Sequence, residues 1–231
     1  MTVRCVLFDL FGTLVHYDAR RVSQSYPDTF QFVQSLAGQA YPLNYESFLA
    51  DTDRIFGELD AWAETHQREF SMQDFAKRLL EEQGIEADSG TLDQFSDLYT
   101  TEWSAGVVAV NGVHTFLSSC AKKFTTGVIT NTHYEPMVMN LLARKSLKPF
   151  EIVTTSVSHG RPKPHADIFL DTLATLDIAP EEAVYVGDTY RADYEGATNA
   201  GLACYLIGQH ARVPREFQIP TVLDLPMHLL R

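Results

Sequence analysis

The chain has few cysteines, no long apolar run and no excess of positive charge, and each shortage excludes a class of protein. Its three cysteines are an odd number and lie far apart, at Cys5, Cys120 and Cys204. A disulfide framework is therefore not expected. No apolar segment approaches the roughly 18 residues that a membrane-spanning helix needs, and the N-terminus lacks the pattern of a signal peptide. We expect a cytoplasmic protein without a membrane partner.

The charge balance disfavours nucleic acid as a partner. Eighteen Lys and Arg residues stand against thirty Asp and Glu residues, which gives a formal net charge of −12. A polyanion is repelled by such a surplus, and a small anionic substrate needs a local positive charge or a metal ion. The length of 231 residues allows one core with a smaller second lobe. The oligomeric state is left open by the sequence.

The sequence contains two kinds of hydrophobic pattern. Residues 1–17 and 104–231 carry short apolar segments separated by amphipathic ones, whereas residues 18–103 carry helical spacing, with a capping-box pattern at Ser71 and Asp74. The later strands of the first pattern are expected at 125–130, 151–156, 183–187 and 203–207. Strands that are apolar at most positions are typical of parallel sheets covered on both faces. The pattern predicts a doubly wound α/β core with an all-helical domain inserted after the first strand.

Polar residues follow several of the predicted strands. Asp9 comes directly after the first strand, Thr130 and Asn131 end the next, Asp188 closes a third, and Lys163 lies between two prolines. Each of these residues alone is more often a turn, a helix cap or a solvated side chain. Because ligands bind beyond the carboxyl ends of the strands in such a sheet, their joint occurrence predicts a site at that edge.

The chemistry of these groups fits the handling of an anion. A carboxylate such as Asp9 can attack a phosphoryl or carbon centre and form an aspartyl intermediate. Mg²⁺ prefers oxygen ligands and can bring two anions together, and the carboxylates of Asp9 and Asp188 with the backbone carbonyl of Phe11 are candidate ligands. Lys163 offers a compact positive charge, and the Thr130 hydroxyl with nearby backbone N–H groups can hold the oxygens of the substrate.

In this order the motifs resemble those of the haloacid dehalogenase superfamily of hydrolases, over essentially the whole chain. The motifs are Asp9-Leu10-Phe11-Gly12-Thr13, Thr130-Asn131, Lys163, and Gly187-Asp188 with Asp193. The helical insertion resembles the cap that closes the active site in one of the subfamilies. The resemblance therefore implies a capped hydrolase with a small anionic substrate.

The resemblance also implies a role for each matching residue. Asp9 becomes the nucleophile and Lys163 a second catalytic group. The implied substrate-binding residues are Gly12, Thr13, Thr130, Asn131 and Lys163. The implied Mg²⁺ ligands are Asp9, the Phe11 backbone carbonyl and Asp188, with Asp193 supporting them as an outer acid.

Phe11 departs from the phosphatase pattern of the superfamily. Those phosphatases usually have an aspartate at this position, which protonates the leaving alcohol, and phenylalanine cannot do so. General acid–base catalysis contributes about 10²–10⁴-fold. Phe11 therefore resembles the dehalogenase and phosphonate-cleaving branches. Dehalogenases of the superfamily, however, work without a metal and carry small polar residues in place of Asp188. They also tend to have a tyrosine in place of Phe169. An arginine from the early part of the cap usually binds their substrate, and Arg20 and Arg21 are the candidates in this chain.

The leading prediction is a Mg²⁺-dependent hydrolase that acts on a small phosphorylated metabolite through an aspartyl intermediate on Asp9. One alternative is a 2-haloacid dehalogenase, in which Asp9 displaces halide. Another is a degenerate member that binds a ligand with little turnover, because Phe11 replaces the acid. Substitute proton donors are His16, His133 and His159, although an ordinary surface role is more frequent for each of them.

Overall fold

The computed structural model describes residues 2–17, 25–37 and 44–226. The chain forms two compact units, each described here by itself. The α/β unit consists of Met1–Tyr17, Val107–Thr132 and Leu142–Arg231, and the helical unit consists of Asp18–Gly106 and His133–Leu141. Arg20 and Arg21, the candidate substrate clamps, lie outside the described residues.

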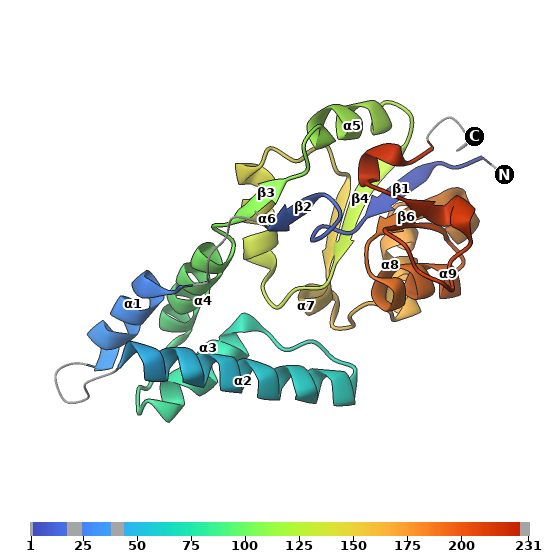
Figure 1. Ribbon diagram of the computed structural model, residues 1–231. Coiled ribbons are helices and arrows are strands. Elements are labelled where there is room, and N and C mark those ends of the chain that lie inside the picture. The colour runs from blue at the N-terminus through green and yellow to red at the C-terminus, as the bar shows by residue number, and fades with distance from the viewer. Residues whose placement is uncertain (1, 18–24, 38–43, 227–231) are drawn as a thin grey trace. The chain divides into compact units, whose positions relative to one another are not determined.

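A parallel sheet forms the centre of the α/β unit (Figure 1). Its strand order is β5(Ile152–Thr155), β4(Thr125–Thr130), β1(Cys5–Phe8), β6(Ala183–Gly187), β7(Ala203–Ile207) and β8(Gln218–Ile219), and all five pairings are parallel. The strands β1 and β6 are buried at every position, as continuous apolar runs require. The predicted doubly wound α/β fold is confirmed.

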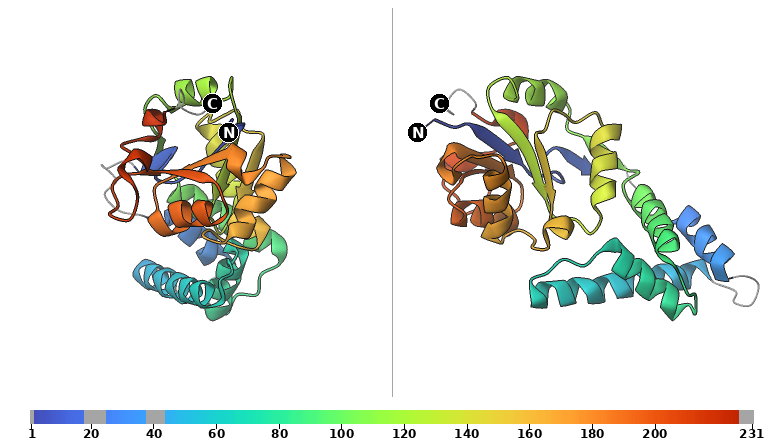
Figure 2. Two further views of the ribbon diagram at one scale, coloured as in Figure 1. Left: turned by 90° about the vertical axis from the view of Figure 1, so that its right-hand side faces the viewer. Right: turned by 180° about the vertical axis from the view of Figure 1, so that it is seen from behind.

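Side chains of β1 alternate between the two faces of the sheet. Cys5 and Leu7 belong to a buried cluster with residues of α8(Ala166–Thr175) and α9(Gly196–Asn199). Phe8, one position further, packs edge-on against Phe116 of α5(Val113–Cys120), with the ring centroids 6.0 Å apart. Helices therefore cover both faces of the sheet (Figure 2), and the side chains of β1 are apolar on both faces.

The shortest elements of the α/β unit were not expected from the sequence. The strand β2(Val15–Tyr17) pairs antiparallel with β3(Val107–Ala109) in a separate small sheet, and β8 has two residues. Segments of two or three residues show neither alternation nor a long apolar run, so periodicity does not reveal them. The remaining elements of this unit are α7(Ser156–His159), the π-helix η3(Tyr190–Glu195) and the 3₁₀ turns η2(Pro180–Glu182), η4(Arg215–Phe217) and η5(Val222–Asp224).

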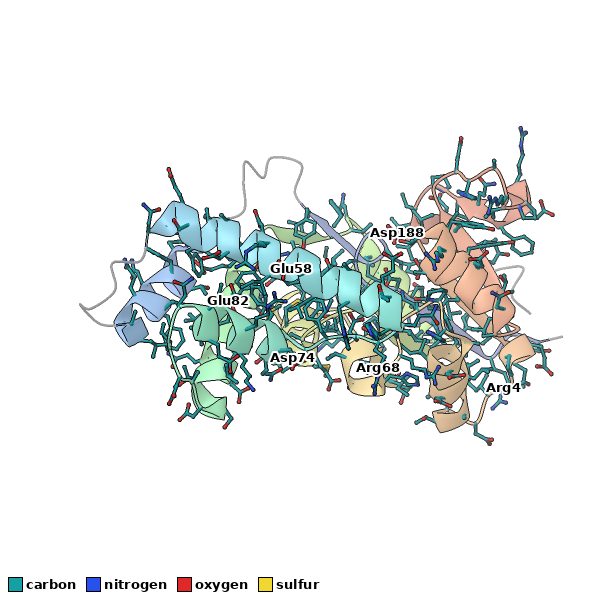
Figure 3. The ribbon with its side chains drawn as sticks, turned by 90° about the horizontal axis from the view of Figure 1, so that it is seen from below. Arg4, Glu58, Arg68, Asp74, Glu82 and Asp188 are labelled. Carbon is teal, nitrogen blue, oxygen red and sulfur yellow. The ribbon has the colours of Figure 1, made fainter. Side chains whose placement is uncertain are left out.

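The helical unit contains α1(Pro27–Ala37), α2(Tyr45–His66), α3(Met72–Glu82) and α4(Ser89–Trp103). The predicted capping box is present at the start of α3, where the side chains of Ser71 and Asp74 each accept a backbone N–H of the other residue. Exposed ion pairs join α2 to α3, because Arg54 and Arg78 both bind Glu58 and Glu82. Figure 3 labels the two acids, Glu58 on α2 and Glu82 on α3.

Residues His133–Leu141 belong to the helical unit although they follow β4 in sequence. The helix α6(Glu135–Arg144) begins within this segment. The backbone N–H of Met72 donates to the carbonyl of His133 at 2.8 Å, and the hydroxyl of Tyr134 donates to Asp97 at 2.8 Å. The predicted domain boundary, with a cap over residues 18–103, stays a prediction.

None of the helices in the described part of the chain is long and apolar enough to cross a lipid bilayer.

Candidate active site

The carboxyl ends of three adjacent strands meet at one edge of the sheet. The strand β1 lies between β4 and β6. Asp9 follows β1, Thr130 is the last residue of β4, and Asp188 follows β6. The backbone N–H of Asp9 donates to the carbonyl of Val186 at 2.8 Å, which extends the pairing of β1 with β6 by one residue. The sheet therefore brings together the acids that the sequence placed at strand ends.

The ammonium group of Lys163 is surrounded by oxygen atoms. Its Nζ lies 2.8 Å from Asp9 Oδ1, 2.6 Å from Asp193 Oδ1 and 2.8 Å from the hydroxyl of Tyr185. All four residues are buried, and Lys163 is only 5% exposed. Three N–H groups face three oxygen atoms, so the hydrogen-bonding capacity of the ammonium group is filled.

Burial and neighbouring charge shift the pKa values of this cluster in specific directions. Burial raises the pKa of Asp9 to about 7; the Lys163 cation opposes this shift, and the carboxylates of Asp193 and Asp188 add to it. For Lys163 burial alone lowers the pKa, but Asp193 and Asp9 outweigh it, so the pKa lies above its ordinary value. Lys163 therefore remains a cation, and Asp9 titrates close to neutrality.

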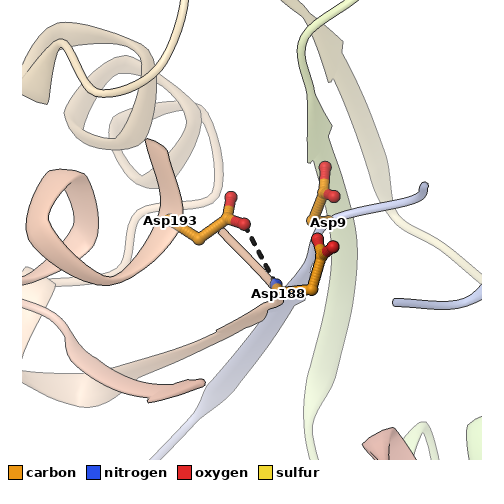
Figure 4. A group of neighbouring side chains, drawn as sticks. All are labelled: Asp9, Asp188 and Asp193. Carbon is orange, nitrogen blue, oxygen red and sulfur yellow. Dashed lines mark hydrogen bonds between the residues drawn. The ribbon is translucent and has the colours of Figure 1, made fainter. Parts of the chain in front are cut away.

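Asp193 supports its neighbours with both carboxylate oxygens. One oxygen binds Lys163, and the other accepts the backbone N–H groups of Asp188 at 3.1 Å and Thr189 at 2.8 Å (Figure 4). A Cβ atom at Gly187 would lie 2.3 Å from Asp193 Cγ, so only glycine fits there. Asp193 thus fixes the loop that carries Asp188, and its predicted role as an outer acid of a metal site stays a prediction.

Asp188 lies at the open side of the cluster. Its side chain passes over Gly12, where a Cβ atom would be 2.1 Å from Asp188 Oδ2, and the φ of +81° at Gly12 also requires glycine. Partial loss of hydration raises the pKa of Asp188, and Asp193 adds to the shift. The structure thus assigns Gly12 a spatial role beside Asp188, and its predicted contact with substrate stays a prediction.

Asn131 holds the loop that carries Lys163. Its side-chain NH₂ donates to the carbonyl of Lys163 at 3.0 Å, and its side-chain oxygen accepts the backbone N–H of Lys163 at 2.9 Å. This pair of bonds fixes the main chain at Lys163. The predicted role of Asn131 in binding substrate stays a prediction.

The other predicted site residues surround the same strand ends. Thr13 is buried, and among the described residues its Oγ1 atom has no hydrogen-bond partner. Thr130 is 1% exposed. Phe11 is half-buried, and its backbone forms a bridge with Val15. The roles predicted for these residues stay predictions.

The donor set fits a hard divalent cation. One carboxylate oxygen from each of Asp9, Asp188 and Asp193 lies within 4.8 Å of the others. With all groups ionised, these three carboxylates and the Lys163 ammonium carry a formal charge of −2. Over the described residues no cationic side chain pairs with the carboxylate of Asp188. Oxygen ligands and this residual charge are what Mg²⁺ requires.

Sequence reasoning missed one member of the cluster, Tyr185. Its ring lies inside β6 and is 0% exposed, yet its hydroxyl reaches Lys163 and Ile129. The signal was a tyrosine in an otherwise apolar buried strand, because a buried Tyr hydroxyl needs a hydrogen-bond partner. The sequence alone did not say which partner that is.

Two of the three candidate proton donors, His159 and His133, make contacts with acids, and the third, His16, is exposed. His159 Nε2 lies 3.0 Å from Asp171 Oδ2. His133 Nδ1 lies 3.0 Å from Glu69 Oε1, inside the helical unit. His16 is exposed on β2. Their proposed part in proton transfer stays a prediction.

Comparison with known proteins identifies relatives of the chain. The family model of haloacid dehalogenase-like hydrolases matches residues 3–201. "Haloacid dehalogenase-like hydrolase domain-containing protein 3" of Xenopus laevis is 33% identical over 58% of this chain and 55% of its own length. Glyceraldehyde 3-phosphate phosphatase of Pyrococcus furiosus is 29% identical over 52% of this chain and 56% of its own length. The chain therefore spans little more than half of these two relatives.

A solved structure resembles nearly the whole chain. The 2-haloacid dehalogenase from Pseudomonas syringae pv. Tomato DC3000 is 25% identical, covers 97% of each chain and has a TM-score of 0.66. The relatives thus include an enzyme named as a phosphatase and one named as a dehalogenase.

Proposed function

Because the chain belongs to the haloacid dehalogenase-like hydrolases, a family of enzymes, we propose that it is a Mg²⁺-dependent phosphatase of a small phosphorylated metabolite. One observation carries this proposal. The acids Asp9, Asp188 and Asp193 form a cluster that Lys163 neutralises only in part. A displacement that needs no metal has no use for the uncompensated carboxylate of Asp188.

In the proposed reaction the nucleophile is Asp9. Lys163 holds its Oδ1 atom, so Oδ2 is the oxygen that attacks phosphorus. The new bond forms as the bond from phosphorus to the leaving oxygen breaks, which gives an aspartyl-phosphate. Water then hydrolyses this intermediate, releases inorganic phosphate and restores the carboxylate.

Asp9, Asp188 and the backbone carbonyl of Phe11 would hold the divalent cation. Bound there, Mg²⁺ supplies the positive charge that lets a phosphate approach a carboxylate. Asp193 keeps Asp188 in place through the two backbone N–H groups that it accepts. Thr13 and Asn131 lie in loops, Thr130 is the last residue of β4, and all three are proposed to bind the phosphate oxygens.

The proton for the leaving group is the open step, because Phe11 cannot provide it. A substrate with a good leaving group, such as an acyl phosphate, needs little protonation. We therefore propose that turnover is faster with acyl phosphates than with alkyl phosphate esters. Phe11→Asp should raise the rate with alkyl esters and change the rate with acyl phosphates less.

The test is a panel of phosphate esters and acyl phosphates beside a panel of 2-haloacids, each with Mg²⁺ and with chelator. We expect phosphate release that disappears with EDTA and with Asp9→Asn. The matched control is Asp167→Asn, an exposed acid of α8 in the same unit, which should keep full activity. Halide release that is insensitive to chelator would overturn the proposal.

A second candidate is hydrolytic dehalogenation, and Phe11 together with the similar dehalogenase structure favours it. In that case Asp9 displaces halide from carbon and the resulting ester is hydrolysed. The third outcome, saturable binding of phosphorylated compounds with no turnover on either panel, would support a ligand-binding role.

A further inference from the structure

We propose that Tyr185 is a positioning residue, whose hydroxyl fixes the ammonium group of Lys163 against the nucleophile Asp9. The proposal deepens the function proposed above and rests on it for its kinetic consequence. Its structural part concerns only contacts inside the α/β unit.

The Tyr185 hydroxyl has one proton and two neighbours that compete for it. The carbonyl oxygen of Ile129 lies at 2.8 Å, and Asp193 Oδ1 lies at 3.3 Å. The shorter bond takes the proton, so the oxygen lone pairs of the hydroxyl are free to accept an N–H of Lys163 at 2.8 Å. Tyr185 therefore acts as an acceptor toward Lys163.

The hydroxyl is held still by the packing of its ring. Tyr185 is 0% exposed and lies in β6 opposite Leu7 on one side and Cys204 on the other. Phe169 meets the ring edge-on, with the centroids 5.0 Å apart and the planes at 83°. A side chain packed in this way has one orientation, so its oxygen is a fixed point for the ammonium group.

Three fixed oxygens define the position of Lys163 Nζ. Asp9 and Asp193 each take one N–H, and Tyr185 takes the third. Without the Tyr185 hydroxyl, two carboxylates alone would attract the ammonium group, and its position between them would be less defined. Because Lys163 orients Asp9, the effect should fall on the chemical step.

The filled coordination of Lys163 separates this role from substrate binding. In this arrangement its three N–H groups are engaged within the protein. Tyr185→Phe should therefore lower kcat with little change in KM. Loss of a hydrogen-bond partner of a metal ligand typically costs about 10–100-fold in metal affinity or activity. Tyr185 acts on the proposed ligand Asp9 through Lys163, so we expect a decrease at the lower end of this range, about 10-fold.

The variant needs a control of the same chemistry. Tyr205 lies on the adjacent strand β7, is 8% exposed and packs against Phe217. Tyr205→Phe removes a tyrosine hydroxyl from the same sheet without touching the contacts of Lys163. Circular dichroism and thermal unfolding of both variants show whether the fold is retained.

A second measurement does not depend on turnover. In a ¹H–¹⁵N spectrum of the lysine ammonium groups, Lys163 should give a slowly exchanging signal, identified by its loss in Lys163→Arg. Tyr185→Phe should shift or broaden this signal, whereas Tyr205→Phe should leave it unchanged. The wild-type spectrum is itself a test: exchange as fast as that of surface lysines would overturn the proposal even if Tyr185→Phe does not fold.

The two arms distinguish the two proposals. If no phosphate compound is hydrolysed but the ammonium signal changes in Tyr185→Phe alone, the proposed function fails and the positioning role stands. If turnover is present and Tyr185→Phe matches Tyr205→Phe in kcat and in the ammonium spectrum, the positioning role is wrong.

Discussion

Each unit of this protein holds a cluster of charged side chains, and the two clusters differ in their exposure to water. In the helical unit Arg54 and Arg78 bind several acids on the surface of α2 and α3. In the α/β unit one cation, Lys163, and its two acids are almost completely withdrawn from water. Exposed ion pairs contribute little to stability, because water screens them. Buried ion pairs shift the pKa values of their members, and their stability depends on every partner being present.

The difference explains where chemistry is possible. In the buried cluster the pKa of Asp9 rises to about 7, and that of Lys163 also rises. In the surface network the largest effect on Glu58 is a hydrogen bond from Arg78, which lowers the pKa and leaves the acid ionised. Of these two clusters, the buried one therefore holds the carboxylate whose charge responds to a ligand near neutral pH.

Removal of the buried cation should produce the largest change. Lys163→Met leaves Asp9 and Asp193 buried without their partner, and breaking such a pair costs about 3–5 kcal/mol. Urea unfolding measures the loss, and turnover should disappear with it. Lys77→Met, on the exposed face of α3, should unfold like the wild type. An equal loss of unfolding free energy in the two variants would contradict the difference between the buried and the exposed charge clusters.

Gly12→Ala should damage the site more than an equivalent change elsewhere. Both Gly12 and Gly84 have positive φ values, +81° and +70°, but only at Gly12 does a Cβ atom meet the carboxylate of Asp188. We expect Gly12→Ala to weaken Mg²⁺ binding and turnover by about 100-fold, because Asp188 must move.

Gly84→Ala in the helical unit introduces a side chain at a positive φ, as Gly12→Ala does, but its Cβ atom meets no other atom within 4 Å. It should lower stability by about 1–3 kcal/mol and leave Mg²⁺ affinity unchanged. Calorimetric titration with Mg²⁺ compares the two variants, and similar affinities would contradict the assignment of Gly12 to the site.

The affinity for Mg²⁺ should depend on pH. The pKa of Asp9 is raised to about 7 and that of Asp188 is raised as well, so protons compete with the metal below neutrality. Affinity should fall as the pH drops through about 7 and increase as it rises, by about 10-fold per protonated ligand and pH unit. Calorimetry at several pH values, with buffers of known protonation enthalpy, measures this. An affinity that is flat across neutral pH would show that Asp9 stays ionised.

The smallest effect on stability is expected from the loss of the N-cap side chain of α3. Ser71→Ala removes the side chain that accepts the backbone N–H of Asp74. Loss of such a cap costs about 1 kcal/mol, which thermal unfolding can resolve. Mg²⁺ affinity should not change, because the acids of the cluster belong to the α/β unit. A change in affinity would mean that the stability of α3 is coupled to the metal site.

Local patterns in the sequence predicted the structural features that depend on residues close together along the chain. The capping box at Ser71 and the apolar runs of β4, β6 and β7 were predicted, because caps and buried strands are set by residues a few positions apart. The strands β2, β3 and β8 were missed, because they are too short to show a period.

Contacts between distant segments could not be predicted in the same way. Asn131 and Lys163 are 32 residues apart, and the hydrogen bonds between them require a register that no local pattern encodes. The same holds for the collision that excludes a side chain at Gly12. It depends on where the loop after β6 passes, and that loop is fixed by Asp193.

By itself the sequence determined the parallel α/β core, the family and the identity of the candidate acids, because these follow from apolar runs and from motifs at strand ends. Only the tertiary structure decided that Lys163 reaches across 154 positions to Asp9, that Tyr185 completes its three hydrogen bonds, and that Asp9 titrates near neutrality. These properties depend on distances between buried groups and on their loss of water, and both arise only when the strands are assembled.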